Sequence, residues 1–103
     1  MYTNPTGIMI VVIVEHFLND EGIRYFPGWI ETARNVISGY EGFHRIDRLE
    51  DVENVSRCVL MLQFRELSLL KVWAKSAAHN ELVAELDPFV VQKRQSKVYS
   101  VSS

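Results

Sequence analysis

Hydrophobic residues along the chain repeat with two different periods. Residues 8–17 and 55–65 are rich in β-branched side chains and predict strands. In the second run every other residue is apolar, as in a strand that buries one face. The first run is apolar on both faces, which predicts a central strand packed on each side. One face of it, expected to point at the helices, carries Ile10, Val12, Val14 and His16.

The next pattern is helical. Apolar residues at spacings of four, three and four predict an amphipathic helix ending at Ser38. We expect Pro27 in its first turn, after an irregular lead-in, because a proline there loses no hydrogen bond. We expect Gly39 to close the helix in the left-handed conformation. The apolar stripe is Phe26, Ile30, Ala33 and Ile37.

Residues 67–88 carry a second helical pattern. Ser76 is followed by good helix formers and predicts an N-cap, so we expect two short helices with a bend at this serine. The poorly alternating run 43–49 predicts a strand at an edge, on a cavity wall or facing solvent. Residues 90–101 predict the last strand.

The predicted order is β-α-β-β-α-β, the ferredoxin-like unit, an α+β fold whose four-stranded antiparallel sheet carries both helices on one face. The length of 103 residues predicts one domain over 1–103, with its core at about 8–101 and a tail at 1–7. The other face of the sheet would be apolar, so we expect a homodimer that covers it. The residues of that face are Met9, Val11, Ile13, Val59 and Met61.

Composition narrows the class of protein. A net charge of −2 gives no attraction to nucleic acid or an anionic membrane. We interpret Lys93, Arg94 and Lys97 as a solvated strand face, because no aromatic residues are interleaved with them. The single cysteine, Cys58, excludes an internal disulfide and favours a reducing, cytoplasmic location. The apolar run 8–14 is much shorter than the about 20 residues of a membrane-spanning helix.

Candidate chemistry gathers in the second helical segment. Trp73, Ser76 and His79 are spaced three apart, which places them on one side of a helix. His79 is suited to act as a general base, or it has a structural role beside the Ser76 cap; Trp73 is either core or a pocket wall. His16, at the end of its strand, is a second candidate base. The three histidines have no HxH or HxxxH spacing, so no metal site is expected.

The Trp73-x-x-Ser76-x-x-His79 string on the last helical segment, with Gly42-Phe43 opening the second strand, resembles the antibiotic biosynthesis monooxygenase family. The resemblance covers nearly the whole chain. It implies a dimer whose sheets pack into a barrel, with a pocket in each subunit between sheet and helices. Some members oxidise phenolic or quinol substrates with O₂ and neither metal nor flavin, whereas others have no assigned activity.

The resemblance therefore implies a cofactor-independent monooxygenase whose partners are O₂ and a small aromatic molecule of unidentified structure. In this hypothesis His16 and His79 are catalytic, and Trp73, Phe43 and Tyr99 bind the substrate. Tyr99 has an open alternative, which is to fill the dimer core. Two other functions stay open on the same scaffold: a ligand-binding dimer without catalysis, and an isomerase-type enzyme.

Haem degradation is not expected. The haem-degrading branch has an asparagine near the end of the first strand and a haem-ligating histidine ten residues after the tryptophan. These positions are occupied here by His16 and Val83. We therefore expect no cofactor.

Overall fold

The computed structural model describes residues 9–101, so the predicted tail at 1–7 and the predicted first strand residue Ile8 lie outside the described residues. The order of elements confirms the predicted α+β, ferredoxin-like fold, with its second helical segment divided in two. The elements are β1 (Met9–Leu18), α1 (Asp20–Ile37), β2 (Phe43–Asp51), β3 (Asn54–Phe64), α2 (Leu67–Ala74), α3 (Ala77–Ala84), the 3₁₀ turn η1 (Asp87–Phe89) and β4 (Val90–Val101).

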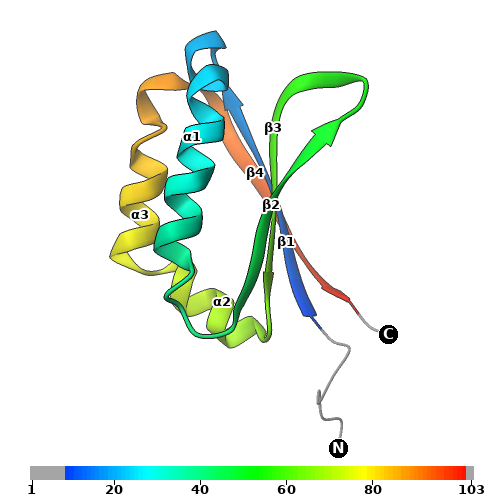
Figure 1. The fold of residues 1–103 in the computed structure, drawn as a ribbon, viewed down its shortest axis with the longest axis vertical. Coiled ribbons are helices and arrows are strands. Elements are labelled where there is room, and N and C mark those ends of the chain that lie inside the picture. The colour runs from blue at the N-terminus through cyan, green and yellow to red at the C-terminus, as the bar shows by residue number, and fades with distance from the viewer. Residues whose placement is uncertain (1–8, 102–103) are drawn as a thin grey trace, which may run out of the picture.

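The four strands form one antiparallel sheet in the order β2-β3-β1-β4. β1 is central and pairs on both sides, as its two apolar faces predict. The helices α1, α2 and α3 all lie against the same face of the sheet (Figure 1). The register between β1 and β3 puts the pairs Ile10–Phe64, Val12–Leu62, Val14–Leu60 and His16–Cys58 on this face, and all of these residues are buried except Val14, which is partly buried.

The hydrophobic core fills the space between the sheet and the helices. It combines the alternate apolar residues of β1 and β3 with the apolar stripe of α1. The largest side chains that are fully buried there are Phe26, Phe64, Ile37, Leu86 and Cys58.

The start of α1 differs from the expectation. The Asn19 side chain accepts a hydrogen bond from the Gly22 backbone N–H at 2.8 Å, so the helix begins at Asp20 and Pro27 lies inside it. An interior proline costs about 3 kcal/mol because it donates no backbone hydrogen bond. Pro27 is exposed, and the Asn19 cap together with the buried stripe on the other side of α1 offsets this cost.

The end of α1 also differs from the expectation. The helix ends at Ile37 with Ser38 in the right-handed conformation, and Gly39 has no positive φ. The left-handed residue is Gly42, with φ +82°, at the turn into β2. A Cβ atom on Gly42 would lie 2.4 Å from Leu69 Cδ1, so both the conformation and the packing require glycine there.

The predicted bend at Ser76 is confirmed. The Ser76 Oγ accepts a hydrogen bond from the His79 backbone N–H at 3.1 Å and donates to the Trp73 carbonyl oxygen at 2.7 Å. The same serine therefore ends the turn after α2 and caps α3. It also fixes where the backbone of His79 lies relative to Trp73.

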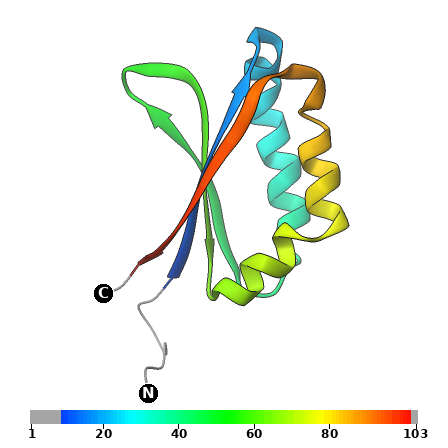
Figure 2. The ribbon, with the colours of Figure 1, turned by 180° about the vertical axis from the view of Figure 1, so that it is seen from behind.

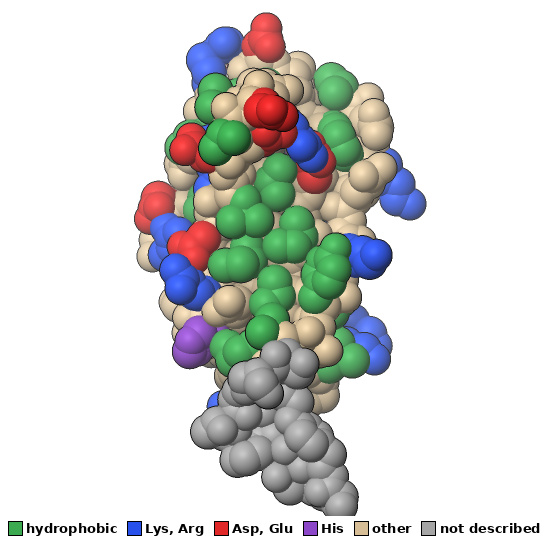
Figure 3. Space-filling model, turned by 90° about the vertical axis from the view of Figure 1, so that its right-hand side faces the viewer, with side chains coloured by type: hydrophobic (Ala, Val, Ile, Leu, Met, Phe, Trp, Pro, Cys, Tyr) green, Lys and Arg blue, Asp and Glu red, His purple; other side chains and the backbone are tan. Residues whose placement is uncertain are grey.

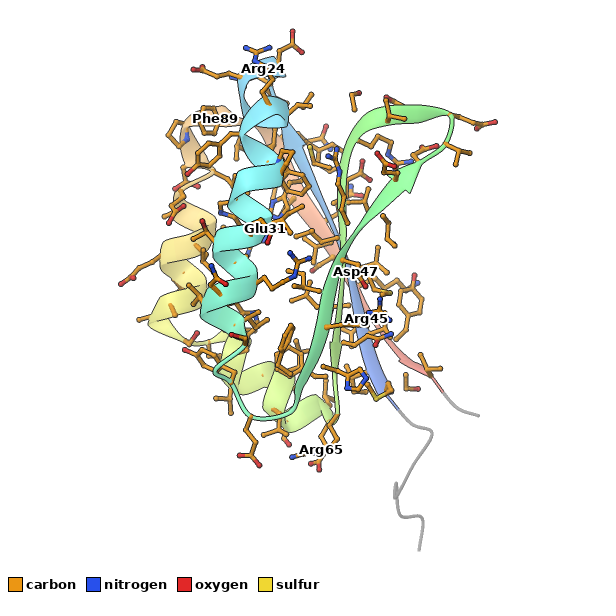
Figure 4. All side chains as sticks on the ribbon, in the orientation of Figure 1. Arg24, Glu31, Arg45, Asp47, Arg65 and Phe89 are labelled. Carbon is orange, nitrogen blue, oxygen red and sulfur yellow. The ribbon has the colours of Figure 1, made fainter. Side chains whose placement is uncertain are left out.

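The sheet face away from the helices is open in the single chain. Apolar side chains run down the middle of this open face, and charged side chains lie around them (Figure 3). Arg45 and Asp47 are alternate residues of β2 and form an ion pair at the margin of this face, with Arg45 Nε 2.6 Å from Asp47 Oδ2 (Figure 4). All twelve residues of β4, an edge strand, are exposed. The β2–β3 hairpin bends away from the helices at its tip (Figure 1).

Candidate active site between the sheet and the helices

A cavity of about 360 Å³ lies between the helix-bearing face of the sheet and the three helices. Its volume is at the small end of the range of ligand pockets, about 300–1,000 Å³. Most of its lining is apolar and comes from the core itself. The buried part of the wall includes Val12, Trp29, Ile37, Leu60, Leu70 and Leu82.

The mouth of the cavity lies between α2 and β4, because the exposed lining residues come from these two elements. Figure 2 shows β4 as the strand nearest the viewer, with α3 to its right and α2 near the lower end of the sheet. The exposed lining residues are Leu67, Lys71 and Ala74 of α2, with Arg94, Ser96 and Val98 of β4.

His16 lies on the wall of the cavity and is buried. Its ring contacts Phe26 and Trp29, with centroids 5.9 and 5.3 Å away, and within residues 9–101 no group forms a hydrogen bond with it. Burial, which has the largest effect, and the charges of Arg94 and His79 together lower the pKa of His16 to about 4. His16 is therefore a neutral imidazole at pH 7, with one unprotonated ring nitrogen.

His79, in the first turn of α3, lines the same cavity and is half-buried. Burial lowers its pKa, the hydrogen bond with Asn80 opposes this, and the charge of Arg94 adds to the lowering. Its Nδ1 lies 3.2 Å from the Asn80 side-chain oxygen. With that oxygen as acceptor, Nδ1 carries the proton and Nε2 is the free base.

Both tryptophans of the chain line the cavity. Trp73 packs edge-on against His79 and Tyr40, with ring centroids 5.4 and 4.9 Å apart, so it is both a core residue and a cavity wall. Trp29 donates its Nε1–H to the Leu82 carbonyl oxygen at 2.8 Å. The sequence interpretation did not single out Trp29, although its position three residues after Phe26 marks it as part of the buried stripe.

Phe43 and Tyr99, the other expected substrate-binding residues, do not line the cavity. Phe43 opens β2 and packs against Phe64, with ring centroids 5.9 Å apart. Tyr99 pairs with Val11 on the open face of the sheet, and its neighbour Val98 takes the position in the cavity. Alternate residues of a strand point to opposite faces, so the register excludes Tyr99 from the cavity of its own subunit.

Arg94 has a role that the sequence interpretation did not foresee. It is exposed, as expected for a solvated strand face, but it also lines the cavity together with Ser96 and Val98. Arg94, Ser96 and Val98 are alternate residues of β4, so their side chains point to the same face of the sheet, the one that carries the helices. The register between β1 and β4 shifts next to it, between Glu15 and Phe17, as at a β-bulge.

Two further properties concern the described residues alone. Within residues 9–101, no three side chains of His, Cys, Asp or Glu come together in a group able to hold a metal ion. No helix in that part of the chain is long and apolar enough to cross a membrane.

Comparison with known proteins relates this architecture to solved structures. No protein-family profile matches the chain. No curated protein matches it by sequence. A candidate antibiotic biosynthesis monooxygenase from Nitrosomonas europaea superposes with a TM-score of 0.78 over 96% of this chain and 93% of that one, at 17% identity. One from Bordetella bronchiseptica gives a TM-score of 0.78 over 91% and 96% of the two chains, at 18% identity. The chain has the antibiotic biosynthesis monooxygenase fold.

The same fold occurs in proteins without an assigned activity. A protein of unknown function from Nitrosomonas europaea superposes with a TM-score of 0.77 at 8% identity, over 93% of this chain and 91% of that one. Likeness at this level of identity establishes the fold, and one fold hosts many functions. The function therefore has to be argued from the cavity.

Proposed function

We propose that the protein is a cofactor-independent monooxygenase that oxidises a small aromatic, phenolic or quinol-like molecule with O₂. One observation carries the proposal: two imidazoles with lowered pKa values, His16 and His79, line one apolar cavity together with the indole of Trp73. Unprotonated imidazoles are general bases, and an indole edge or face holds a planar ring.

The chemistry needs only a base, a ring and oxygen. A neutral imidazole removes the hydroxyl proton of a phenol and leaves an electron-rich phenolate. The phenolate passes one electron to O₂, the resulting radicals combine at a ring carbon, and the protonated imidazole returns its proton to give the hydroperoxide. Cleavage of its O–O bond with loss of water yields the quinone, so that phenol and O₂ are converted to quinone and H₂O. The apolar walls exclude bulk water from these intermediates.

The test is O₂ consumption with a panel of simple phenols and hydroquinones. We expect His16→Ala and His79→Ala each to lower the rate at least tenfold. The control is His44→Ala, because His44 is exposed on β2 outside this cavity. Rates like the wild type in both cavity variants would contradict the residue assignments, and no O₂ consumption with any substrate would contradict the class. Product formed without O₂ would indicate an isomerase-type enzyme, and a ligand recovered unchanged would indicate a binding protein.

We also propose that the active form is a homodimer through the open face of the sheet. The apolar stripe on this face supports the proposal, because monomeric proteins rarely expose a continuous apolar surface (Figure 3). A second copy would cover the stripe by symmetry, and Tyr99 would then fill the dimer core. A reducing, cytoplasmic location fits the same proposal, because Cys58 is a buried free thiol.

A further inference from the structure

The charged side chains that line the cavity are both cations. Arg94 of β4 and Lys71 of α2 line it, and no Asp or Glu does. Within residues 9–101, neither cation lies within 4.0 Å of a carboxylate oxygen. Residues 1–8 contain no Asp or Glu in their sequence. The cavity therefore offers positive charge that the described protein does not itself neutralise.

The charge of Arg94 acts on the interior of the cavity as well as on its mouth. It disfavours protonation of both His16 and His79, in addition to the effect of their burial. At pH 7 the polar side chains of the cavity, besides the two indoles, are thus two neutral imidazoles, a serine hydroxyl and two cations. This set attracts an anion and repels a cation.

The two cations lie at the mouth, not at the buried end. Arg94 and Lys71 are both exposed, and they come from the two elements between which the cavity opens. A ligand whose ring occupies the apolar interior would present its outer substituent to them. A guanidinium donates two parallel hydrogen bonds to a carboxylate, and an ammonium adds a point charge.

We propose that the ligand of this cavity is a small aromatic carboxylic acid, with its ring against Trp73 and its carboxylate held at the mouth by Arg94. Lys71, on the other side of the mouth, supplies the second cation. The inference rests on the proposed function in that it concerns the same cavity, and it narrows the phenolic substrate to one that also carries a carboxylate. The volume of about 360 Å³ suits one small ring system.

The test compares three naphthalene probes that differ in charge at one position: naphthalene-2-carboxylate, the neutral 2-naphthalenemethanol and the cationic 2-naphthalenemethylamine. Binding at pH 7.5 is followed by NMR through the indole N–H signals. The chain has two tryptophans, Trp29 and Trp73, and both line the cavity, so these signals report its occupancy. We expect the carboxylate to bind at least tenfold more tightly than the alcohol, and the amine to bind more weakly than either.

Arg94→Gln is the decisive variant. It should lower the affinity for the carboxylate at least tenfold while it leaves the affinity for the alcohol within twofold. The matched control is Lys75→Gln, which removes the same charge from an exposed residue after α2 that does not line the cavity. This control should bind all three probes as the wild type does.

The outcomes separate this inference from the proposed function. Equal affinity for carboxylate and alcohol, unchanged carboxylate binding in Arg94→Gln, or no movement of either indole signal with any probe would overturn the ligand class. Arginine-dependent binding of the carboxylate, without O₂ consumption by hydroxynaphthoates, would uphold the ligand class and contradict the oxygenase. O₂ consumption with neutral phenols alone would uphold the oxygenase and contradict the ligand class.

Discussion

The imidazole of His16 lies edge-on to the indole of Trp29, with ring centroids 5.3 Å apart and ring planes at 74°. The Trp29 Nε1–H donates to the Leu82 carbonyl oxygen at 2.8 Å, which joins α1 to α3. The candidate base on β1 is thus packed against a ring whose own position is fixed by a buried hydrogen bond between two helices. The shape of the cavity around His16 depends on this arrangement.

Trp29→Phe should lower the free energy of unfolding. The variant removes the indole donor to the Leu82 carbonyl oxygen, which still accepts from the Glu85 backbone N–H at 3.2 Å. The lost hydrogen bond costs about 0.5–1.5 kcal/mol in addition to the loss of ring volume. The control is Trp73→Phe, which loses the same ring volume at a site where the indole N–H has no acceptor within residues 9–101. Urea denaturation followed by circular dichroism measures both. Equal losses in the two variants would contradict a stabilising role for the hydrogen bond.

The burial of neutral His16 predicts a specific loss of stability in acid. Its pKa is about 4 in the folded protein, against an ordinary value of 6.5, so the unfolded chain binds more protons between these values. The stability from this group is fully present above pH 6.5 and is lost as the pH falls toward 4. At 1.36 kcal/mol per pKa unit, the loss is about 3 kcal/mol.

The measurement for His16 is urea denaturation of wild type and His16→Gln at pH 7.5 and pH 4.5. Glutamine does not titrate, so the difference between the two pH values should be smaller in the variant. His44→Gln, at an exposed position on β2, is the control and should keep the wild-type difference. An identical pH dependence in wild type and His16→Gln would show that other groups account for the loss.

Ser76→Ala should remove the cap of α3. Both hydrogen bonds of the Ser76 hydroxyl are lost, the one from the His79 N–H and the one to the Trp73 carbonyl oxygen. The expected decrease in the free energy of unfolding is about 1 kcal/mol. Ser68→Ala, at an exposed position in α2, is the matched control and should have little effect. Similar denaturation midpoints for the two variants would contradict the capping role.

Met61→Glu should convert the proposed homodimer to a monomer. Met61 pairs with Ile13 in the apolar stripe of the open face, where a partner copy would have to desolvate the new carboxylate. Val72→Glu adds the same charge on the exposed side of α2 and should stay dimeric. Light scattering coupled to gel filtration measures the mass, and circular dichroism verifies folding. A monomeric wild type, or a dimeric Met61→Glu, would contradict an interface on this face.

Local patterns in the sequence accounted for most of the fold. The alternation in β3, the two apolar faces of β1 and the cap at Ser76 are set by neighbouring residues, so each was correctly predicted. The predicted start of α1 was wrong, because the Asn19 cap and the buried stripe of the helix stabilise it by more than Pro27 destabilises it.

The sequence predicted only part of the candidate site. His16, Trp73 and His79 were singled out, and the structure brings them to one cavity. Tyr99 was expected there and Arg94 was not, because the direction of a side chain on β4 depends on the register with β1 and on the bulge beside it.

By itself, the sequence determined the types and order of the elements, because hydrophobic periodicity and helix caps act over a few residues. Only the tertiary structure decided which face of each strand and helix lines the cavity. It therefore also decided that Arg94 and Lys71 lie at one mouth. Strand register and helix packing are set by contacts between residues far apart in the chain. A shift of one residue along β4 would exchange Arg94 for a neighbour and reverse every side chain of that strand.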